Sequence, residues 1–377
     1  MRLPVSRRPA VDLRAILAIA VRGRDLGARL TVCNAPSHNG LLQRHYNNVP
    51  LHDAPRTSVR GSIVKLLRDL ASLNLDHRGG AVSIGNFDGV HLGHARIISE
   101  LIAAARVAGG PAVVFTFDPH PVRLLRPAEA PPPLTWTDRK AQLLAELGVD
   151  VVIAYPTDEA LLQLSADDFF QRIVQDALGA RAMVEGPNFY FGRGRSGTID
   201  VLRGLCDRSD VNMKIVEPLK VEGDFVSSSR IRKLLADGQV DEARRMLTHP
   251  YRLRGMVTHG AGRGAKIGFA TANLAAIDTL LPGLGVYAGA AYTDGVRWPA
   301  AINVGPNPTF GEHALKMEVH LIDYSGQLYG QPLEVDFLSR LRDIQPFANV
   351  QALQAQLQQD ITTSRRIAAE TLGGKLV

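Results

Sequence analysis

The chain has 377 residues, 43 lysines and arginines against 37 acidic residues, and a formal net charge of +6. This length indicates two or three domains, and no apolar run is long enough to cross a membrane. Two cysteines, Cys33 and Cys206, give no disulfide framework and fit a reducing compartment, so we expect a cytoplasmic protein.

The basic charge is concentrated at the N-terminus. Residues 1–60 contain ten arginines, three aspartates and neither lysine nor glutamate, about +7 by charge counting, so the rest of the chain is near −1. This distribution argues against nucleic-acid binding by the folded body. Residues 13–21 could form a short helix, but turn formers follow without a clear period. We expect residues 1–61 to be a disordered basic extension or the product of an upstream start codon; a functional basic arm is the alternative.

From residue 62 onward, strand-like and helix-like patterns alternate. Helical patterns occur at residues 97–105, 138–147, 166–178 and 240–247. Strands are predicted at residues 81–84, 112–117, 149–154, 182–185 and 213–216. Such alternation predicts an α/β domain with a parallel sheet covered on both faces. Ligands of such sheets bind beyond the carboxyl ends of the strands.

A glycine-rich turn follows the first of these strands. It reads Gly85-Asn86-Phe87-Asp88-Gly89-Val90-His91-Leu92-Gly93-His94 and leads into a helical pattern. A strand, a glycine-rich turn and a helix start point backbone N–H groups and a positive dipole end at an anion. His91 and His94 add two donors that could hold a nucleotide's phosphates and stabilise charge at an attacked α-phosphorus. Two histidines at a helix start are more often merely exposed, so the strand–turn–helix context matters.

Other stretches of this region follow strands or start helices. Residues 115–121 end a strand, and prolines 127 and 131–133 then form a loop that either covers a ligand or is a plain surface loop. Asn188 offers an amide that could read an adenine or flavin edge, and Arg193 and Arg195 could meet phosphates. Before another helix, Ser227, Ser228 and Ser229 either cap the helix or bind a triphosphate.

Near residue 250 the pattern changes to short strands separated by turns. Strands at residues 251–258, 285–292, 298–304, 316–322 and 333–337 predict a small antiparallel barrel. An amphipathic helix is predicted from about residue 349 to residue 369.

Two stretches of this second region suggest phosphate chemistry. Residues 260–269, with Gly262, Arg263 and Lys266, form a cationic glycine-rich segment, expected as a mobile loop over phosphates. Thr271 and Asn273 follow in an extended segment and point the same way, so both could serve one Mg–nucleotide. Alternation over residues 317–323 places Glu318 and His320 on the polar face, where Glu318 is a candidate base, although most strand glutamates are merely solvated.

In this order, the motifs of residues 62–370 resemble those of the bacterial bifunctional riboflavin kinase/FAD synthetase family. The resemblance implies a Rossmann-like nucleotidyltransferase domain over residues 62–249 and a riboflavin kinase barrel with a C-terminal helix over residues 250–377. It also implies Mg²⁺ and ATP, with riboflavin, FMN and FAD as substrates and products. Small molecules are then the expected partners, with flavin-requiring apoproteins as recipients, without nucleic acid or membrane, and with homo-oligomerisation left open.

The resemblance also implies roles for single residues. In the kinase, Glu318 would be the general base, Thr271 and Asn273 would hold Mg–ATP, and Arg263 and Lys266 would lie over the phosphates. In adenylylation, His91 and His94 would stabilise developing charge, and Arg232 would face the leaving pyrophosphate. The implied nucleotide- or flavin-binding positions are Gly85, Asn86, Phe87, Asp88, Gly93, Asn188, Arg193, Arg195, Ser227, Ser228, Ser229, Gly262, Arg263, Lys266, Asn273 and Asn303, the last within the motif of residues 303–310.

Two positions depart from the family pattern. Ala270 stands where the family usually has proline, which could loosen the magnesium site, and Ile344 stands where it usually has glutamate, which bears on flavin affinity. Three rival functions remain: a kinase with an inactive nucleotidyltransferase half, an adenylyltransferase for another phosphomonoester, and a nucleic-acid-binding protein.

Overall fold

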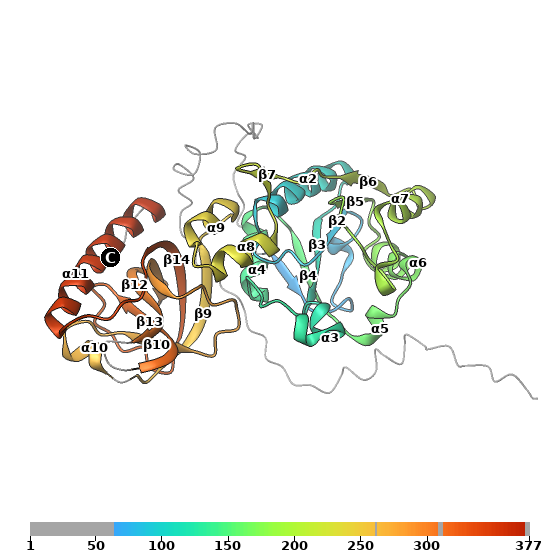
Figure 1. The fold of residues 1–377 in the computed structure, drawn as a ribbon. Helices are drawn as coiled ribbons and strands as arrows, with labels where there is room; N and C mark the ends of the chain where they lie inside the picture. The colour runs from blue at the N-terminus through green and yellow to red at the C-terminus, as the bar shows by residue number, and fades with distance from the viewer. Residues whose placement is uncertain (1–63, 261, 308–311, 374–377) are drawn as a thin grey trace, which may run out of the picture. The chain divides into compact units, whose positions relative to one another are not determined.

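The computed structural model describes residues 64–260, 262–307 and 312–373 (Figure 1). The expected basic extension over residues 1–61, with its short helix at 13–21, lies outside the described residues. Residues 308–310 of the motif that begins at Asn303 also lie outside them. Within the described ranges, no helix is both long and apolar enough to cross a bilayer.

The N-terminal part contains a six-stranded sheet with the order β1-β4-β3-β2-β5-β6. Its strands are β1 (Lys65–Leu67), β2 (Ala81–Ile84), β3 (Ala112–Asp118), β4 (Val151–Pro156), β5 (Ala182–Glu185) and β6 (Asn212–Ile215). All neighbouring strands pair in parallel, as predicted. The chain moves from β2 to β3 and β4 on one side and returns to β5 on the other side of β2. The strand order therefore reverses between β2 and β5, where sheets of this kind bind ligands.

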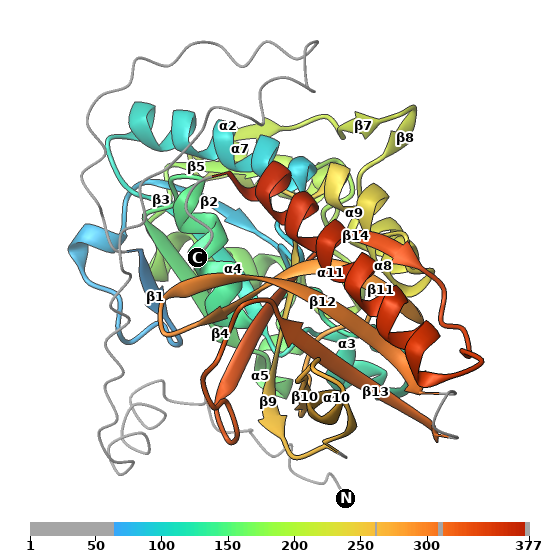
Figure 2. The ribbon, with the colours of Figure 1, turned by 90° about the vertical axis from the view of Figure 1, so that its left-hand side faces the viewer.

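Helices cover both faces of this sheet (Figures 1 and 2). Side chains of α2 (Leu92–Ala108) and α4 (Thr137–Glu146) form one buried cluster with β strands. Side chains of α6 (Ala166–Phe169), the π-helical turns η4 (Phe170–Ala177) that continue it, and α7 (Ile199–Arg208) form the other. This two-sided burial confirms the prediction.

Short elements complete the N-terminal part and lead to the barrel. They are η2 (Leu75–His77), α3 (Val122–Leu125), η3 (Pro127–Glu129), α5 (Glu159–Leu162), η5 (Arg193–Arg195), β7 (Lys220–Val221), β8 (Asp224–Phe225), α8 (Ser228–Ala236) and α9 (Val240–Met246). The helix expected at residues 240–247 is α9.

The C-terminal part is a closed antiparallel barrel with the order β10-β13-β12-β11-β14-β9. Its strands are β9 (Tyr251–Thr258), β10 (Ala272–Ala275), β11 (Gly285–Thr293), β12 (Val296–Asn307), β13 (Glu312–Leu321) and β14 (Pro332–Arg342). Tyr287, Val319 and Phe337 are fully buried in its interior. The barrel confirms the predicted architecture, and β10 is the strand that the sequence pattern indicated only as an extended segment.

The terminal helix α11 (Val350–Leu372) packs against β11, β12 and β14 (Figure 2). Its start is capped by Asn349, whose side chain accepts a hydrogen bond from the Ala352 N–H. Asp360 lies on its buried face and accepts hydrogen bonds of 3.1 and 2.8 Å from Arg342 at the end of β14. This pair fixes the helix to the rim of the barrel.

Removing Asp360 should leave Arg342 as a largely buried charge without its carboxylate. We expect Asp360→Ala to lower the free energy of unfolding by about 3 kcal/mol, measured by equilibrium urea unfolding. Glu370→Ala is the matched control, because its ion pair with Arg366 lies on the same helix but is exposed. Such a pair contributes at most about 1 kcal/mol. Equal losses for the two variants would contradict the role given to the Arg342–Asp360 pair.

Candidate functional site

Polar side chains gather at the carboxyl end of β2, where residues 85–94 lead into α2. His91 is the N-cap of α2, and its Nδ1 accepts a hydrogen bond of 3.2 Å from the backbone N–H of His94. A Cβ atom at position 93 would lie 3.1 Å from this Nδ1. Gly93 therefore allows the His91 ring to fold back over the helix start.

The two histidine rings stack on each other, with centroids 3.6 Å apart. Because Nδ1 of His91 accepts a hydrogen bond, the neutral ring carries its proton on Nε2. Burial lowers the pKa of His91 to about 4, although Asp88 acts in the opposite direction. Burial also lowers the pKa of His94 well below its usual value, and the neighbouring His91 adds to this. At neutral pH both rings are hydrogen-bond donors without charge.

Asp88 ties this turn to two other segments. Its carboxylate accepts hydrogen bonds of 3.0 Å from the backbone N–H groups of Leu134 and Thr135, and it pairs with the Arg232 guanidinium of α8. Its backbone carbonyl accepts a hydrogen bond of 2.8 Å from the Ser228 hydroxyl. The resemblance implies that Asp88 binds nucleotide, but its carboxylate is thus occupied by donors of the protein. It holds Arg232 beside the turn that carries His91 and His94.

Of the remaining serines, one supports the capping alternative, and the structure gives no evidence on triphosphate binding. Ser227 is the N-cap of α8 and accepts a hydrogen bond of 3.2 Å from the Arg230 N–H, as the capping alternative requires. Ser229 is exposed. In the proline-containing loop before α4, the Pro132 carbonyl accepts a hydrogen bond of 2.9 Å from Arg232.

A buried lysine behind the turn was missed at the sequence level. Lys140 of α4 is 7% exposed, and its ammonium donates to the Thr116 hydroxyl at 3.3 Å. Thr116 in turn donates to the Asn86 carbonyl at 3.1 Å. Lys140 lies three and four residues before Leu143 and Leu144 on the apolar face of its helix. This position on the apolar face could have indicated a buried polar contact in the sequence, because a buried lysine needs a partner.

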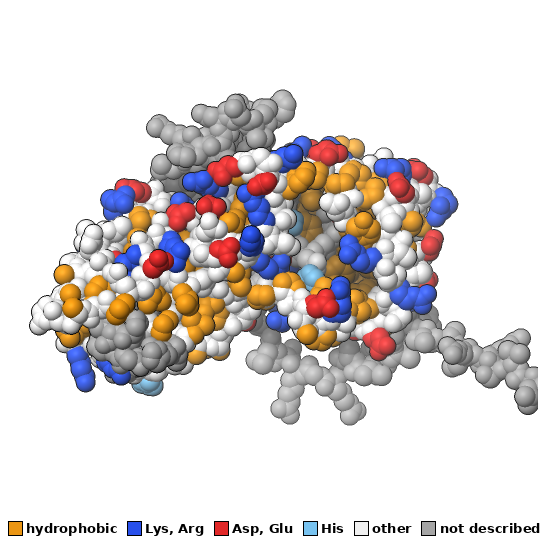
Figure 3. All heavy atoms as spheres, viewed as in Figure 1, with side chains coloured by type: hydrophobic (Ala, Val, Ile, Leu, Met, Phe, Trp, Pro, Cys, Tyr) orange, Lys and Arg blue, Asp and Glu red, His pale blue; other side chains and the backbone are white. Residues whose placement is uncertain are grey.

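The candidate binding residues Asn188, Arg193 and Arg195 lie on a loop after β5. Asn188, Arg193 and Arg195 are exposed, and the Arg195 guanidinium lies 4.3 Å from the centroid of the Tyr190 ring. Figure 3 shows a hollow in the N-terminal part with histidine side chains inside it. The stacking of His91 on His94 and the pairing of Arg232 with Asp88 bring these residues together, whereas the loop cations lie at the surface.

In the barrel, a row of side chains crosses neighbouring strands at one level. Asn273 of β10 pairs in register with Glu318 of β13, and Glu318 pairs with Asn303 of β12. The row continues through Val286 of β11 to Arg342 of β14. Residues directly opposite each other have Cβ atoms roughly 4.5–5.5 Å apart. The members of this row all line one cavity, so strand register alone brings the carboxylate between two amides.

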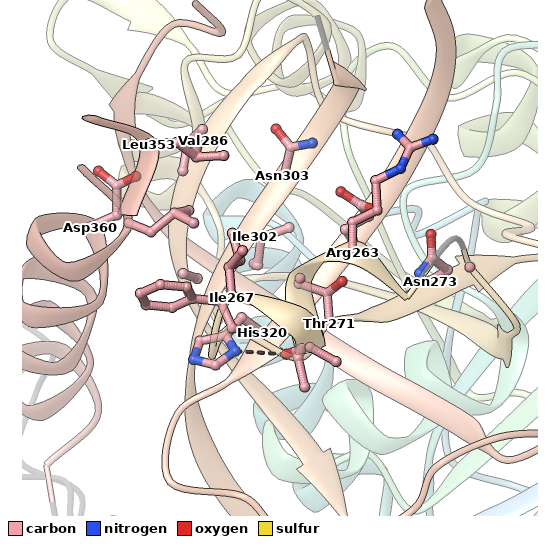
Figure 4. Close-up of a pocket in the computed structure, with 18 of the residues that line it drawn as sticks. Arg263, Ile267, Thr271, Asn273, Val286, Ile302, Asn303, His320, Leu353 and Asp360 are labelled. Carbon is pink, nitrogen blue, oxygen red and sulfur yellow. Dashed lines mark hydrogen bonds between the residues drawn. The ribbon is translucent and has the colours of Figure 1, made fainter. Parts of the chain in front are cut away.

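The two ends of this cavity differ in character (Figure 4). One end is lined by Gly262 and Arg263 of the glycine-rich segment and by Thr271, which follows it. The other end has an apolar wall formed by Leu353, Leu357 and Ile361 of α11. A molecule with an anionic end and a flat apolar end matches these surroundings.

The glycine-rich segment differs from the expected loop. It contains a short helix, α10 (Arg263–Lys266), closed by a hydrogen bond of 2.8 Å from the Phe269 N–H to the Gly264 carbonyl. Gly264 permits this turn because a Cβ there would lie 2.3 Å from the Phe269 oxygen. Lys266 is exposed and lies outside the cavity lining, whereas Arg263 is part of it.

The two departures from the family pattern both lie in the cavity wall. The Ala270 carbonyl accepts a hydrogen bond of 2.7 Å from Nδ1 of His320, which tethers the segment before Thr271 without a proline (Figure 4). Ile344 packs on Gly305, where a Cβ would lie 2.0 Å from the Ile344 Cδ1. An apolar contact therefore occupies the place where a glutamate is usual.

Comparisons with known proteins agree with this division of the chain. A family model described as FAD synthetase matches residues 73–230, and one described as riboflavin kinase matches residues 247–368. The bifunctional riboflavin kinase/FMN adenylyltransferase of Pseudomonas fluorescens is 36% identical, over 81% of this chain and 98% of its own length. That of Escherichia coli (strain K12) is 33% identical, over 80% and 97%.

A solved structure is similar over the same extent. Titled as a macrolide-efflux protein from Streptococcus pneumoniae, it has a TM-score of 0.71 and 30% identity and covers 80% of this chain and 99% of its own. A nucleotidyltransferase-type parallel sheet followed by a kinase-type barrel defines a two-domain transferase. With the matches over both domains, the chain belongs to the bifunctional riboflavin kinase/FMN adenylyltransferase family.

The buried, capping position of His91 predicts its titration. Its folded pKa of about 4 lies below the unfolded value near 6.5, so stability should be full above about pH 6.5 and fall as the pH drops toward 4. Nitrogen-15 NMR of the imidazoles should find His91 as the Nε2–H tautomer at pH 7. His91→Asn retains a capping acceptor and should lose less stability over this pH window. A ring that titrates near 6.5 would refute the assignment.

Proposed function

We propose that the chain phosphorylates riboflavin to FMN with ATP in the barrel and adenylylates FMN to FAD with a second ATP in the N-terminal domain, releasing pyrophosphate. The observation that carries the proposal is the in-register row of Asn273, Glu318 and Asn303 inside the segment that matches riboflavin kinases. We place the domain limits at residues 62–249 and 250–377, because β9 begins at Tyr251.

In the kinase reaction, the 5′-hydroxyl oxygen of the ribityl chain attacks the γ-phosphorus of ATP, and ADP leaves. Glu318 accepts the hydroxyl proton as the bond forms. Arg263 and the backbone of the glycine-rich segment lie at the phosphate end, and the apolar side chains of α11 take the flavin ring. The contribution of the protein is positioning and charge stabilisation, as in other phosphoryl transfers.

Magnesium fits the oxygen donors at the phosphate end. Mg²⁺ binds one or two protein oxygens together with substrate phosphates and several waters. Thr271 and Asn273 supply a hydroxyl and an amide oxygen on the same side of one extended segment of the cavity wall. When bound, Mg²⁺ neutralises charge on the phosphates.

In the adenylylation, a phosphate oxygen of FMN attacks the α-phosphorus of ATP, and pyrophosphate leaves. His91 and His94 donate neutral hydrogen bonds to the α-phosphate oxygens. Arg232 supplies the positive charge toward pyrophosphate, held in place by Asp88. The exposed loop cations Arg193 and Arg195, together with Asn188, close over the nucleotide or the flavin.

The products are cofactors, so apoproteins that need FMN or FAD are the proposed recipients. The buried free thiol of Cys206 fits a reducing, cytoplasmic setting.

Chromatography of the flavins after incubation with riboflavin, ATP and Mg²⁺ tests the proposal. FAD together with transient FMN is the expected result. FMN alone would mean an inactive nucleotidyltransferase half. Neither flavin product would overturn the proposed function and leave adenylylation of another phosphomonoester, or nucleic-acid binding, to be tested.

Replacing Glu318 separates the two reactions. Glu318→Gln keeps the shape and one acceptor oxygen but removes the basicity, so FMN formation should fall about 10²- to 10⁴-fold. FAD formation from supplied FMN is the internal control and should persist, because His91 and His94 belong to the other domain. Riboflavin phosphorylation near the parent rate would mean that Glu318 is merely a strand residue facing the cavity.

Replacing His94 tests the other half. His94→Phe keeps a ring to stack on His91 but removes both nitrogens, so adenylylation of FMN should slow about 10²- to 10³-fold, the scale of one lost oxyanion donor. Riboflavin phosphorylation, measured in the same samples, should be unchanged. Adenylylation at the parent rate, or equal losses of both activities, would remove His94 from the mechanism.

A further inference from the structure

Glu185 is a buried carboxyl group at the point where the strand order of the parallel sheet reverses. It is the last residue of β5 and is 3% exposed. Its Oε1 accepts a hydrogen bond of 2.7 Å from the backbone N–H of Ile84, the last residue of β2. The register pairing of these two strands is confined to Ala81 with Ala182 and Val82 with Met183. The side-chain contact therefore lies beyond the end of the ladder.

The surroundings of Glu185 differ from those of other buried carboxyl groups. Among the described residues, Asp88, Asp336 and Asp360 are also buried, and each pairs with an arginine. The contact of Glu185 is a backbone N–H instead, and burial raises its pKa well above the usual range. Cys206 of α7 is the titratable group beside it, with a pKa raised to about 11 mainly by burial.

The turn after β2 is held differently on its other side. The Gly85 N–H donates to the Phe115 carbonyl at 3.0 Å and extends the ladder with β3. The Thr116 hydroxyl then bonds the Asn86 carbonyl, and Lys140 bonds Thr116. On the β3 side, the turn is thus held by a backbone hydrogen bond and by the side chains of Thr116 and Lys140. On the β5 side, the hydrogen bond beyond the end of the ladder comes from the Glu185 side chain.

We propose that Glu185 is a positioning residue for adenylylation. Its side chain links β2 to β5 at a point where a backbone hydrogen bond of the ladder would hold the two strands closer together. The longer link sets the separation between residues 85–94, which carry the histidine pair, and residues 186–197, which follow β5. In the proposed adenylylation, the nucleotide and the FMN phosphate lie between these two segments, so the proposal rests on the proposed function of this domain. A misplacement of about 1 Å at such a site costs roughly 10²-fold in rate.

Three variants test the proposal in steady-state kinetics of FMN adenylylation, with riboflavin phosphorylation in parallel. Glu185→Gln keeps a carbonyl acceptor and should hold kcat/KM within about threefold of the parent, because the hydrogen bond from the Ile84 N–H needs only an acceptor oxygen. Glu185→Met keeps the volume without the acceptor and should lower kcat about 10- to 100-fold. Glu100→Gln is the matched control, since it breaks an exposed pair with Lys214 in the same domain. The kinase rate should be unchanged throughout.

Adenylylation by Glu185→Met at the parent rate would overturn the proposal, and so would a Glu185→Gln variant as slow as Glu185→Met, because a charge would then be required. Should Glu185→Met fail to fold, Glu185→Asp shortens the reach by one methylene and should give the same loss. Hydrogen exchange of the Ile84 amide provides a readout without substrate: it should accelerate in Glu185→Met and stay slow in Glu185→Gln. A parent that makes no FAD refutes the proposed function, while the exchange result still decides whether Glu185 holds β2 to β5.

Discussion

The backbone groups left over where the β2 ladders end are the constraint on which the N-terminal site depends. A buried N–H or C=O must find a partner. At this end of β2 the partners are side chains: Glu185 for the Ile84 N–H and Thr116 for the Asn86 carbonyl. In the same turn, the Asp88 carboxylate accepts hydrogen bonds from the N–H groups of Leu134 and Thr135 in the loop before α4. The groups that satisfy the backbone are therefore also those that shape the turn before α2. Asp88 also pairs with Arg232, so a side chain of the same turn positions the cation.

The barrel site is formed differently, because its polar side chains are brought together by the strand pairing itself and not by side-chain contacts beyond the ladder. Asn273, Glu318 and Asn303 come from three strands and meet through uninterrupted register. A slip of one residue in β13 would turn Glu318 inward and expose Val319, which is fully buried. The interior packing that specifies the register thus also specifies the place of the carboxylate. His320, two residues along the same face, extends this control to the Ala270 carbonyl.

Much of the fold was predictable, because period-two and helical patterns follow directly from burial on one or two faces. The strand at residues 182–185 and the strand at residues 251–258 have the predicted limits. The motif residues His91, His94, Glu318 and Thr271 could be proposed as candidates from the sequence, since their chemistry and local spacing are contained in short stretches, and their roles stay predictions.

Residues whose partners lie far along the chain were not predictable in the same way. Glu185 bonds Ile84 across 101 positions, and Asp360 and Lys140 likewise gain their meaning from partners on other elements. From the sequence alone, a polar residue at a strand end or on a helix is predicted to be solvent-exposed, and its buried partner is known only from the structure. The converse holds for Lys266, whose motif suggested a place over the phosphates while the local turn of α10 directs it to solvent. Its role and those of Asn188, Arg193 and Arg195 stay predictions.

The attachment of α11 through Arg342 and Asp360 has a consequence for the shape of the cavity. All six strands of the barrel close their ladders without the helix, yet Leu353, Leu357 and Ile361 form the apolar wall of the cavity. Substitutions at these three helical positions can therefore reshape the apolar side of the cavity without disturbing strand pairing. The row of Asn273, Glu318 and Asn303 lies on paired strands, whereas the apolar wall lies on a helix that the buried Arg342–Asp360 pair joins to the barrel.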